Sequence, residues 1–147
     1  MPTTVQPYPP HYAGPEFQRA RVHDAMRVGV VTCEPETSLR DVARIMVGYQ
    51  IHSLLVGDMT SQENPWGIIT DLDLAAAAAS DMSELTARDV ASSDLISVPA
   101  NESLPAAAKQ MADRKCTHLL AVQPDTGRPV GVISALGLAS VIAAGYE

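Results

Sequence analysis

The chain has 147 residues, a length typical of one domain, and its 46% hydrophobic content is enough to bury a core. Acids outnumber bases by 17 to 10, and the formal charge of −7 gives no general attraction for DNA or RNA phosphates. No apolar stretch approaches the ~18 residues needed to cross a bilayer, and residues 1–20 lack the apolar segment of a signal peptide. We therefore expect a soluble cytoplasmic protein without membrane or nucleic-acid partners, in which Cys33 and Cys116 are buried thiols.

The N-terminal residues 1–18 differ in composition from the rest of the chain. They hold five of the eleven prolines and three of the six aromatic residues, Tyr8, Tyr12 and Phe17. Because proline fixes φ and lacks a backbone N–H donor, this composition predicts an extended tail rather than a core element. The tail is either a disordered terminus or an arm that packs its aromatic side chains on a partner subunit.

The first half of the remaining chain predicts five elements in the order strand, helix, strand, strand, helix. Thr37 or Ser38 is a natural N-cap for the first helix, in which apolar residues recur at three- and four-residue spacing, and Gly48 is expected to end it. The expected elements are a strand at 30–33, a helix from about 38 to 48, strands at 53–56 and 66–70, and an alanine-rich helix at 71–79.

The second half repeats this pattern at an offset of 65 residues. Asp24 aligns with Asp89 and Met46 with Met111, and after a one-residue change in a loop 67–70 aligns with 131–134. The expected elements are strands at 95–98, 118–122 and 129–134 and helices at 104–114 and 135–144. Because a unit of about 60 residues buries little surface alone, the two β-α-β-β-α units, 19–81 and 82–147, are expected to share one core.

The segment from Gly67 to Asp73 is the most informative candidate site. A strand delivers Thr70 to the start of a helix, where free backbone N–H groups attract anions, and Asp73 follows three residues later. A hydroxyl and a carboxylate on that turn suit a ribose and a phosphate. The same Thr-x-x-Asp spacing is also that of a capping box, which serves only the helix.

Taken together, these features resemble a tandem pair of CBS (cystathionine-β-synthase) domains, a Bateman module, here as a stand-alone protein. The resemblance spans about residues 20–144. The segments that carry it are Asp24-Ala25-Met26, Val31-Thr32, Ser38 to Met46, Ile51 to Val56 and Gly67 to Asp73. It implies an α+β fold, with mixed α and β elements, in which two β-α-β-β-α units pack through their sheets as one pseudo-two-fold module.

The resemblance also implies an adenosyl ligand, such as AMP, ADP, ATP or S-adenosylmethionine, bound in a cleft between the units. Thr70 would contact ribose or phosphate, and Asp73 would hold the ribose hydroxyls. The adenine pocket would be lined by Ile51, His52 and Ser53, with Val30 and Thr32 on the other wall. In the second unit Cys116, Thr117, His118 and Ser134 occupy the corresponding places, but Gly137 stands where an aspartate is expected. This predicts one competent site and one degraded or empty site.

Charge and the remaining motifs narrow the expected ligand and chemistry. Nine acids but only one base, Arg88, lie between Asp58 and Glu102, which favours S-adenosylmethionine or AMP over ATP. The candidate phosphate-binding cations are Arg27, Arg40, Arg44, Arg114 and Lys115, although most are expected on solvent-facing helix surfaces. The four histidines lack zinc-ligand spacing, and no nucleophile has an associated base, so we expect neither a metal site nor a catalytic residue or catalytic cofactor.

The expected function is that of a regulatory module that senses an adenosyl compound and modulates a separate, unidentified target protein. The alternative is a ligand-free structural or dimerisation module, in which Thr70 and Asp73 only cap a helix. A small enzyme is a third hypothesis, which lacks a supporting acid–base or metal cluster. Long apolar faces on the helices at 71–79 and 135–144 predict a homodimer.

Overall fold

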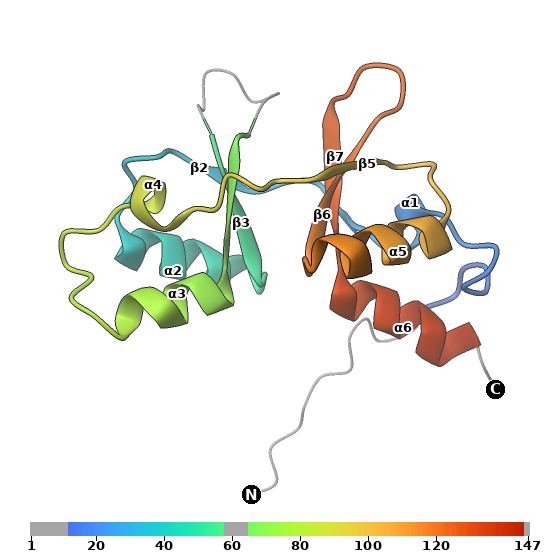
Figure 1. Ribbon diagram of the computed structural model, residues 1–147, viewed down its shortest axis with the longest axis horizontal. Coiled ribbons are helices and arrows are strands. Elements are labelled where there is room, and N and C mark those ends of the chain that lie inside the picture. The colour runs from blue at the N-terminus through green and yellow to red at the C-terminus, as the bar shows by residue number, and fades with distance from the viewer. Residues whose placement is uncertain (1–11, 58–64, 146–147) are drawn as a thin grey trace, which may run out of the picture. The chain divides into compact units, whose positions relative to one another are not determined.

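A computed structural model describes residues 12–57 and 65–145 of the chain (Figure 1). They form two compact units. Residues 30–95 make one, which we call the first-repeat unit, and residues up to Gly29 combine with those from Ile96 onward to make the other, the second-repeat unit. Within the described chain no helix is long and apolar enough to cross a membrane.

The first-repeat unit combines a three-stranded sheet with two longer helices and a third helix of four residues. Its sheet has the order β2-β3-β4, with β2 parallel and β4 antiparallel to β3. Leu54, Val56 and Ile69 from this sheet are fully buried together with Val42 of the first helix. The elements are β2 (Thr32–Cys33), α2 (Leu39–Tyr49), β3 (Ser53–Val56), β4 (Gly67–Thr70), α3 (Asp71–Ala78) and α4 (Ala87–Val90).

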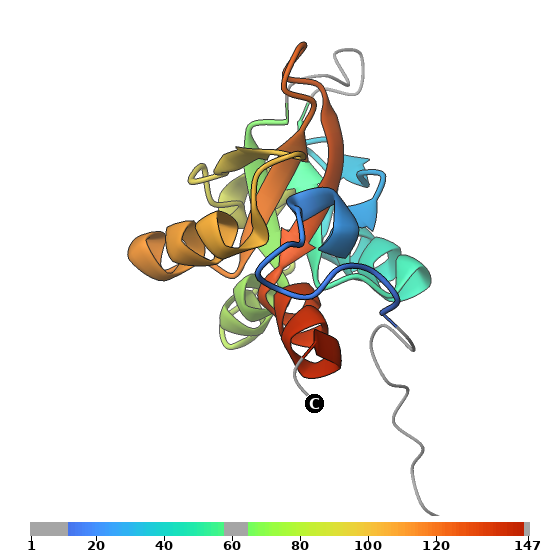
Figure 2. The same cartoon turned by 90° about the vertical axis from the view of Figure 1, so that its right-hand side faces the viewer.

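The second-repeat unit repeats this plan with one more strand. Its sheet has the order β1-β7-β6-β5, and Figure 2 shows α1 lying across β7, close to α6. The core contains the fully buried Leu104, Leu119, Ile133 and Val141. The elements are α1 (Val22–Ala25), β1 (Arg27–Val28), β5 (Ser97–Pro99), α5 (Leu104–Arg114), β6 (His118–Val122), β7 (Pro129–Ser134) and α6 (Ala135–Gly145).

Each unit contains the segment that leads into the other repeat. Helix α1 precedes the first repeat but contacts α5, α6 and β7, whereas α4 precedes the second repeat but contacts α3. The exchange is reciprocal, because two equivalent backbone bridges hold the two segments. Arg21 pairs with Ser103, and the residues that correspond to them at the offset of 65, Thr86 and Ser38, pair with each other. The boundaries of the compact units therefore differ from those of the sequence repeats, 19–81 and 82–147.

Helices α2 and α5 begin and end in the same way. Ser38 and Ser103 are the N-caps, and their hydroxyls accept from the backbone N–H groups of Asp41 and Ala106 at 3.2 Å. The prediction that Gly48 ends the first helix is wrong. The helix continues to Tyr49, because the next residue adopts the left-handed conformation at φ 55° and its N–H bonds the carbonyls of the last turn.

The expected α+β fold with two β-α-β-β-α units is confirmed, and the bounds of 104–114, 118–122 and 129–134 are those observed. The strand expected at 30–33 is shorter, 32–33, and that at 95–98 shifts to 97–99. Most of the expected N-terminal tail, Tyr8 included, lies outside the described residues. Tyr12 and Phe17 are described, and both pack against the core of the second-repeat unit.

Both cysteines are free thiols within the described residues, as expected. Cys33 is 4% exposed, and burial raises the pKa of its thiol above the ordinary value, which outweighs the opposing hydrogen bond with Thr37. Cys116 is only partly buried. The two side chains therefore differ in chemical accessibility although neither forms a disulfide.

Candidate functional site

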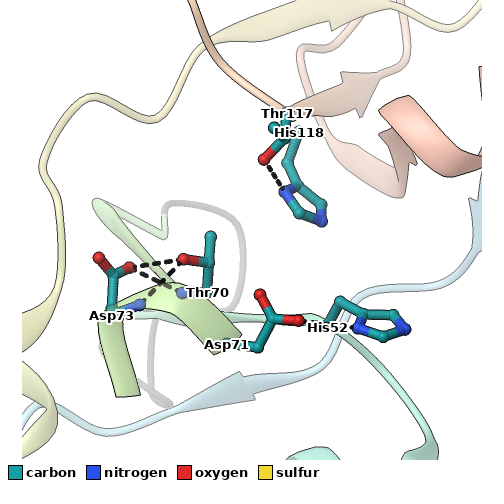
Figure 3. Close-up of polar contacts among 6 residues, drawn as sticks. All are labelled: His52, Thr70, Asp71, Asp73, Thr117 and His118. Atoms are coloured by element: carbon teal, nitrogen blue, oxygen red, sulfur yellow. Dashed lines mark hydrogen bonds and ion pairs between the residues drawn. The ribbon is translucent and has the colours of Figure 1, made fainter. Parts of the chain in front are cut away.

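The junction between β4 and α3 is built around Thr70 and Asp73 (Figure 3). The backbone N–H and the hydroxyl of Thr70 donate to Asp73 Oδ2 at 2.8 and 3.1 Å, and the backbone N–H of Asp73 donates to Thr70 Oγ1 at 3.3 Å. This is a complete capping box that fixes the first turn of α3. The capping role expected from the sequence is therefore real.

The capping box does not use all of the Asp73 carboxylate. Both bonds that it accepts end on Oδ2, and Oδ1 has no hydrogen-bond partner among the described residues. A carboxylate can accept several hydrogen bonds, so Oδ1 remains available to a hydroxyl while Oδ2 holds the helix start. Asp73 is half-buried rather than enclosed. Capping and ligand recognition are therefore compatible at this residue.

The other residues of the expected first site come to the same edge of the sheet. Ser53 opposes Thr70 in the β3–β4 ladder, and the His52 carbonyl accepts from the backbone N–H of the residue after Thr70 at 3.1 Å. Ile51 lies just before them and donates its N–H to the last turn of α2. On the neighbouring strand β2, Thr32 opposes Leu55. Val30 precedes Thr32 by two residues, at the same edge of the sheet.

Asp71 belongs to this edge as well, although sequence reasoning did not select it. Its Oδ2 lies 3.0 Å from His52 Nδ1, with 63% of the Asp71 side chain and 65% of the His52 side chain exposed (Figure 3). At such exposure the pair adds little stability. The sequence feature that points to Asp71 is its position directly after Thr70, as the first residue of α3. Side chains at the start of a helix lie close to a group bound there.

The equivalent edge of the second-repeat unit carries the residues expected for the degraded site. His118 opposes Ser134 across β6 and β7, and the Thr117 carbonyl accepts from Ala135 N–H at 2.8 Å. Thr117 Oγ1 lies 2.9 Å from His118 Nδ1 (Figure 3). Cys116 just precedes them and donates its backbone N–H to Met111. The backbone plan is thus the same in both units.

Packing explains why this second edge lacks a carboxylate. Gly137 N–H donates to Ser134 Oγ at 3.0 Å, which reproduces half of the capping box. A Cβ at Gly137 would lie 3.1 Å from the Ala25 carbonyl oxygen and 3.4 Å from Ser134 Oγ. The carbonyl of the last residue of α1 therefore crowds the position that an aspartate Cβ would take.

The first turn of α3 is acidic, because it carries Asp71 and Asp73. Arg44 bonds Asp41 at 3.1 Å and Arg88 bonds Glu36 at 2.8 Å, and no described hydrogen bond or ion pair links either arginine to Thr70 or Asp73. In the described part of the chain, no group of three or more His, Cys, Asp or Glu side chains is placed to hold a metal ion.

The CBS domain family matches the chain twice, over residues 22–80 and 87–144. The chain belongs to the CBS domain family. The resemblance expected from the repeat and its motifs is thereby confirmed, and the two family matches follow the two repeats of the sequence.

Solved CBS structures share this fold. The CBS domain pair of protein MJ0100, in complex with 5′-methylthioadenosine and S-adenosyl-L-methionine, has a TM-score of 0.76 and 21% identity over 87% of this chain and 99% of that chain. An uncharacterized conserved protein from Pyrococcus horikoshii has a TM-score of 0.74 and 20% identity over 88% and 96%. The CBS domain of the bacterial CNNM/CorC family Mg2+ transporter in complex with ATP has a TM-score of 0.73 and 18% identity over 88% and 92%.

One curated relative is an enzyme. The homoserine O-acetyltransferase of Methanocorpusculum labreanum is 27% identical over 123 residues, which make up 82% of this chain and 24% of that protein. This CBS domain chain thus spans about a quarter of the length of that relative.

Proposed function

We propose that this CBS domain pair is a non-catalytic regulatory module that binds an adenosyl ligand at the β4–α3 junction of the first-repeat unit. The observation that carries the proposal is the geometry of Asp73, whose Oδ2 fixes the helix start while Oδ1 is available to ribose hydroxyls. Thr70 and the edge residues 51–53 complete the proposed contacts to ribose and base. The solved complexes of related CBS structures with S-adenosyl-L-methionine and with ATP support an adenosyl ligand.

Local charge selects among adenosyl ligands. Asp71 and Asp73 both lie in the first turn of α3, so a phosphate chain there would face two carboxylates. A cationic sulfonium, or a single phosphate that meets the free N–H groups of the helix start, is less repelled. We therefore propose S-adenosylmethionine or AMP rather than ADP or ATP as the ligand.

The second-repeat unit is proposed to bind no adenosyl ligand at its equivalent edge. Gly137 supplies no carboxylate, and the Ala25 carbonyl oxygen lies only 3.1 Å from where a Cβ at this position would be. The expected stoichiometry is one ligand per chain.

Isothermal titration calorimetry with AMP, ADP, ATP and S-adenosylmethionine tests the site, and the chain offers a matched control. Thr86 and Asp89 form a second capping box, with bonds of 2.8 and 3.2 Å to Asp89 Oδ2, at the start of α4 in the same unit. Asp73→Ala and Asp89→Ala should each cost about 1 kcal/mol of unfolding free energy. Only Asp73→Ala should abolish binding.

The outcomes separate the proposal from its alternative. Binding that survives Asp73→Ala, or that Asp89→Ala removes equally, contradicts the proposed site. No binding of any of the four ligands at millimolar concentration favours a ligand-free structural module, which the complete capping box of Thr70 and Asp73 also supports.

The regulatory output is proposed to act through a separate target protein and a homodimer of this chain. A ligand can shift such an assembly only if it binds one of its states more tightly than the other. The exposed apolar residues Leu72 of α3 and Leu136 and Ile142 of α6, at 75%, 49% and 40% exposure, support association of this module.

A further inference from the structure

The chain passes between the two compact units twice, through segments that are equivalent in the repeat. The first crossing, residues 27–32, leaves β1 and enters β2. The second crossing, residues 92–97, leaves a bridge to β4 and enters β5. The two correspond at the offset of 65 residues. Val30 and Thr32 of the first crossing belong to the proposed ligand site, so the conformation of this segment bears on that site.

The first crossing is held at two points that leave one residue between them. Gly29 donates its backbone N–H to the Val130 carbonyl at 2.8 Å, which extends the pairing of β1 with β7. The Val31 carbonyl accepts from Leu55 N–H at 3.0 Å, next to the pairing of β2 with β3. Val30 lies between these bonds and makes no backbone hydrogen bond to another described residue. A shift at either point therefore reaches Val30.

The second crossing is held less closely. Ser92 bonds β4 and Ile96 bonds β6, which leaves three residues, 93–95, between the two points. Asp94 is the counterpart of Gly29, and its N–H donates to the Ser92 hydroxyl at 3.2 Å, within the crossing itself. The first crossing is therefore the one through which a displacement passes with little loss.

Gly29 adopts a backbone conformation that its counterpart does not share. Its φ is 86°, in the left-handed region, whereas Asp94 is not among the described residues with positive φ. No atom lies within 4 Å of the position that a Cβ on Gly29 would take. Glycine adopts positive φ freely, and an L-residue is disfavoured there. The position therefore calls for glycine because of its backbone and not because space is short.

We propose that Gly29 is a positioning residue for the adenosyl site, because its conformation fixes the wall formed by Val30 and Thr32. A ligand packed on that wall restrains Val30, which joins β2 to the bond between Gly29 and β7. Ligand binding should therefore stabilise the pairing of β1 with β7, and stable pairing should favour the ligand in return. The inference rests on the proposed ligand site and adds a covalent path by which the second-repeat unit responds to it.

Two glycines with the same backbone requirement provide the test. Gly127 has φ 72°, open space at its Cβ position and an N–H that donates at 2.8 Å, and it lies in the β6–β7 turn outside both crossings. Gly29→Ala and Gly127→Ala should destabilise the full chain to a similar extent in urea. In calorimetric titrations with S-adenosylmethionine and with AMP, only Gly29→Ala should weaken binding, by about tenfold.

A milder variant and the unmutated chain test the same link. Gly29→Asn should bind more tightly than Gly29→Ala, because asparagine adopts the left-handed conformation more readily. In the wild type, saturating S-adenosylmethionine should slow amide exchange of the Gly29 N–H by about threefold or more, as measured by NMR. Exchange of the Gly127 N–H should stay unchanged.

The outcomes separate this inference from the proposed function. A wild-type chain that binds neither compound at millimolar concentration overturns both. Binding that Gly29→Ala and Gly127→Ala leave equally strong, or exchange of the Gly29 N–H that bound ligand does not slow, overturns the role of Gly29 alone.

Discussion

The two equivalent helix starts differ at the residue that closes the capping box. At the first, Asp73 closes a capping box with Thr70; at the second, Gly137 closes only half of one with Ser134. The Ala25 carbonyl oxygen, 3.1 Å from where a Cβ would lie, would have to shift by a few tenths of an ångström to admit a larger residue at Gly137. The asymmetry between the proposed competent and degraded sites therefore coincides with close packing of Gly137 against the last residue of α1.

The two thiols should differ in reactivity. Burial raises the pKa of Cys33, so less of it is thiolate at pH 8, and its 4% exposure limits access by reagents. We expect an aromatic disulfide reagent to modify the partly buried Cys116 at least about tenfold faster than Cys33. Mass spectrometry of the labelled chain measures the difference, and the Cys116→Ser variant isolates the slow reaction.

Unfolding provides the control for this prediction. In urea above the unfolding transition both thiols should react at similar rates, because the shift in the Cys33 pKa exists only in the folded protein. Equal rates in the native protein would show that Cys33 opens to solvent readily.

At the scale of elements, helices α2 and α5 each end at a residue in the left-handed conformation that is not glycine. Gln50 has φ 55° and Lys115 has φ 53°. This conformation costs an L-residue roughly 1–2 kcal/mol, a cost that glycine avoids. Glycine loses more conformational entropy on folding, which offsets part of that gain. We expect Gln50→Gly and Lys115→Gly each to raise the free energy of unfolding by about 0.5 kcal/mol.

Urea denaturation followed by circular dichroism measures this gain. Ala112→Gly is the matched control, because it places glycine at an exposed position inside α5, where it should cost up to about 1 kcal/mol. Destabilisation by all three substitutions would contradict the role assigned to the left-handed caps.

The sequence predicted the regular elements well and the short ones poorly, for a physical reason. Helices α2 and α5 have apolar residues at helical spacing and serine N-caps, which are local signals. Helices α1 and α4 have four residues each, and β1 has two, so no periodicity marks them. They form because they dock on the sheet or helices of a unit, and such long-range contacts are not visible in a local pattern.

The candidate site shows the same limit. The capping box of Thr70 and Asp73 was predictable because it is a local motif. Residues 51–53 follow only from the resemblance to CBS domain pairs. The position of Asp71 beside Thr70 is visible in the sequence, but its contact with His52 depends on pairing between β3 and β4. Charges that approach each other through a sheet register cannot be read from spacing along one helix.

At the scale of the whole molecule, the exchange of leading segments determines which fragments should fold. A fragment of residues 30–95 contains α4, whose Ala87 is fully buried in the first-repeat unit, and Ser92, which bridges Ile68. A fragment of residues 19–81 follows the sequence repeat but lacks both. We expect 30–95 to unfold cooperatively in urea and 19–81 to lack a cooperative transition, as measured by circular dichroism.

Residues 30–95 differ from 19–81 at both ends, and a third fragment separates the two changes. A fragment of residues 19–95 adds α4 back and should regain the cooperative transition. Cooperative unfolding of 19–81 with the same midpoint as 30–95 would show that α4 is dispensable.

The same exchange decides how the chain responds to mechanical tension. The first-repeat unit occupies one continuous stretch, 30–95, and the segments on both sides of it belong to the second-repeat unit. A pull applied through those flanking segments is carried by the second-repeat unit, with β1 held along β7, while residues 30–95 form a bypassed loop. The unit with the proposed ligand site therefore bears no load until the other one opens.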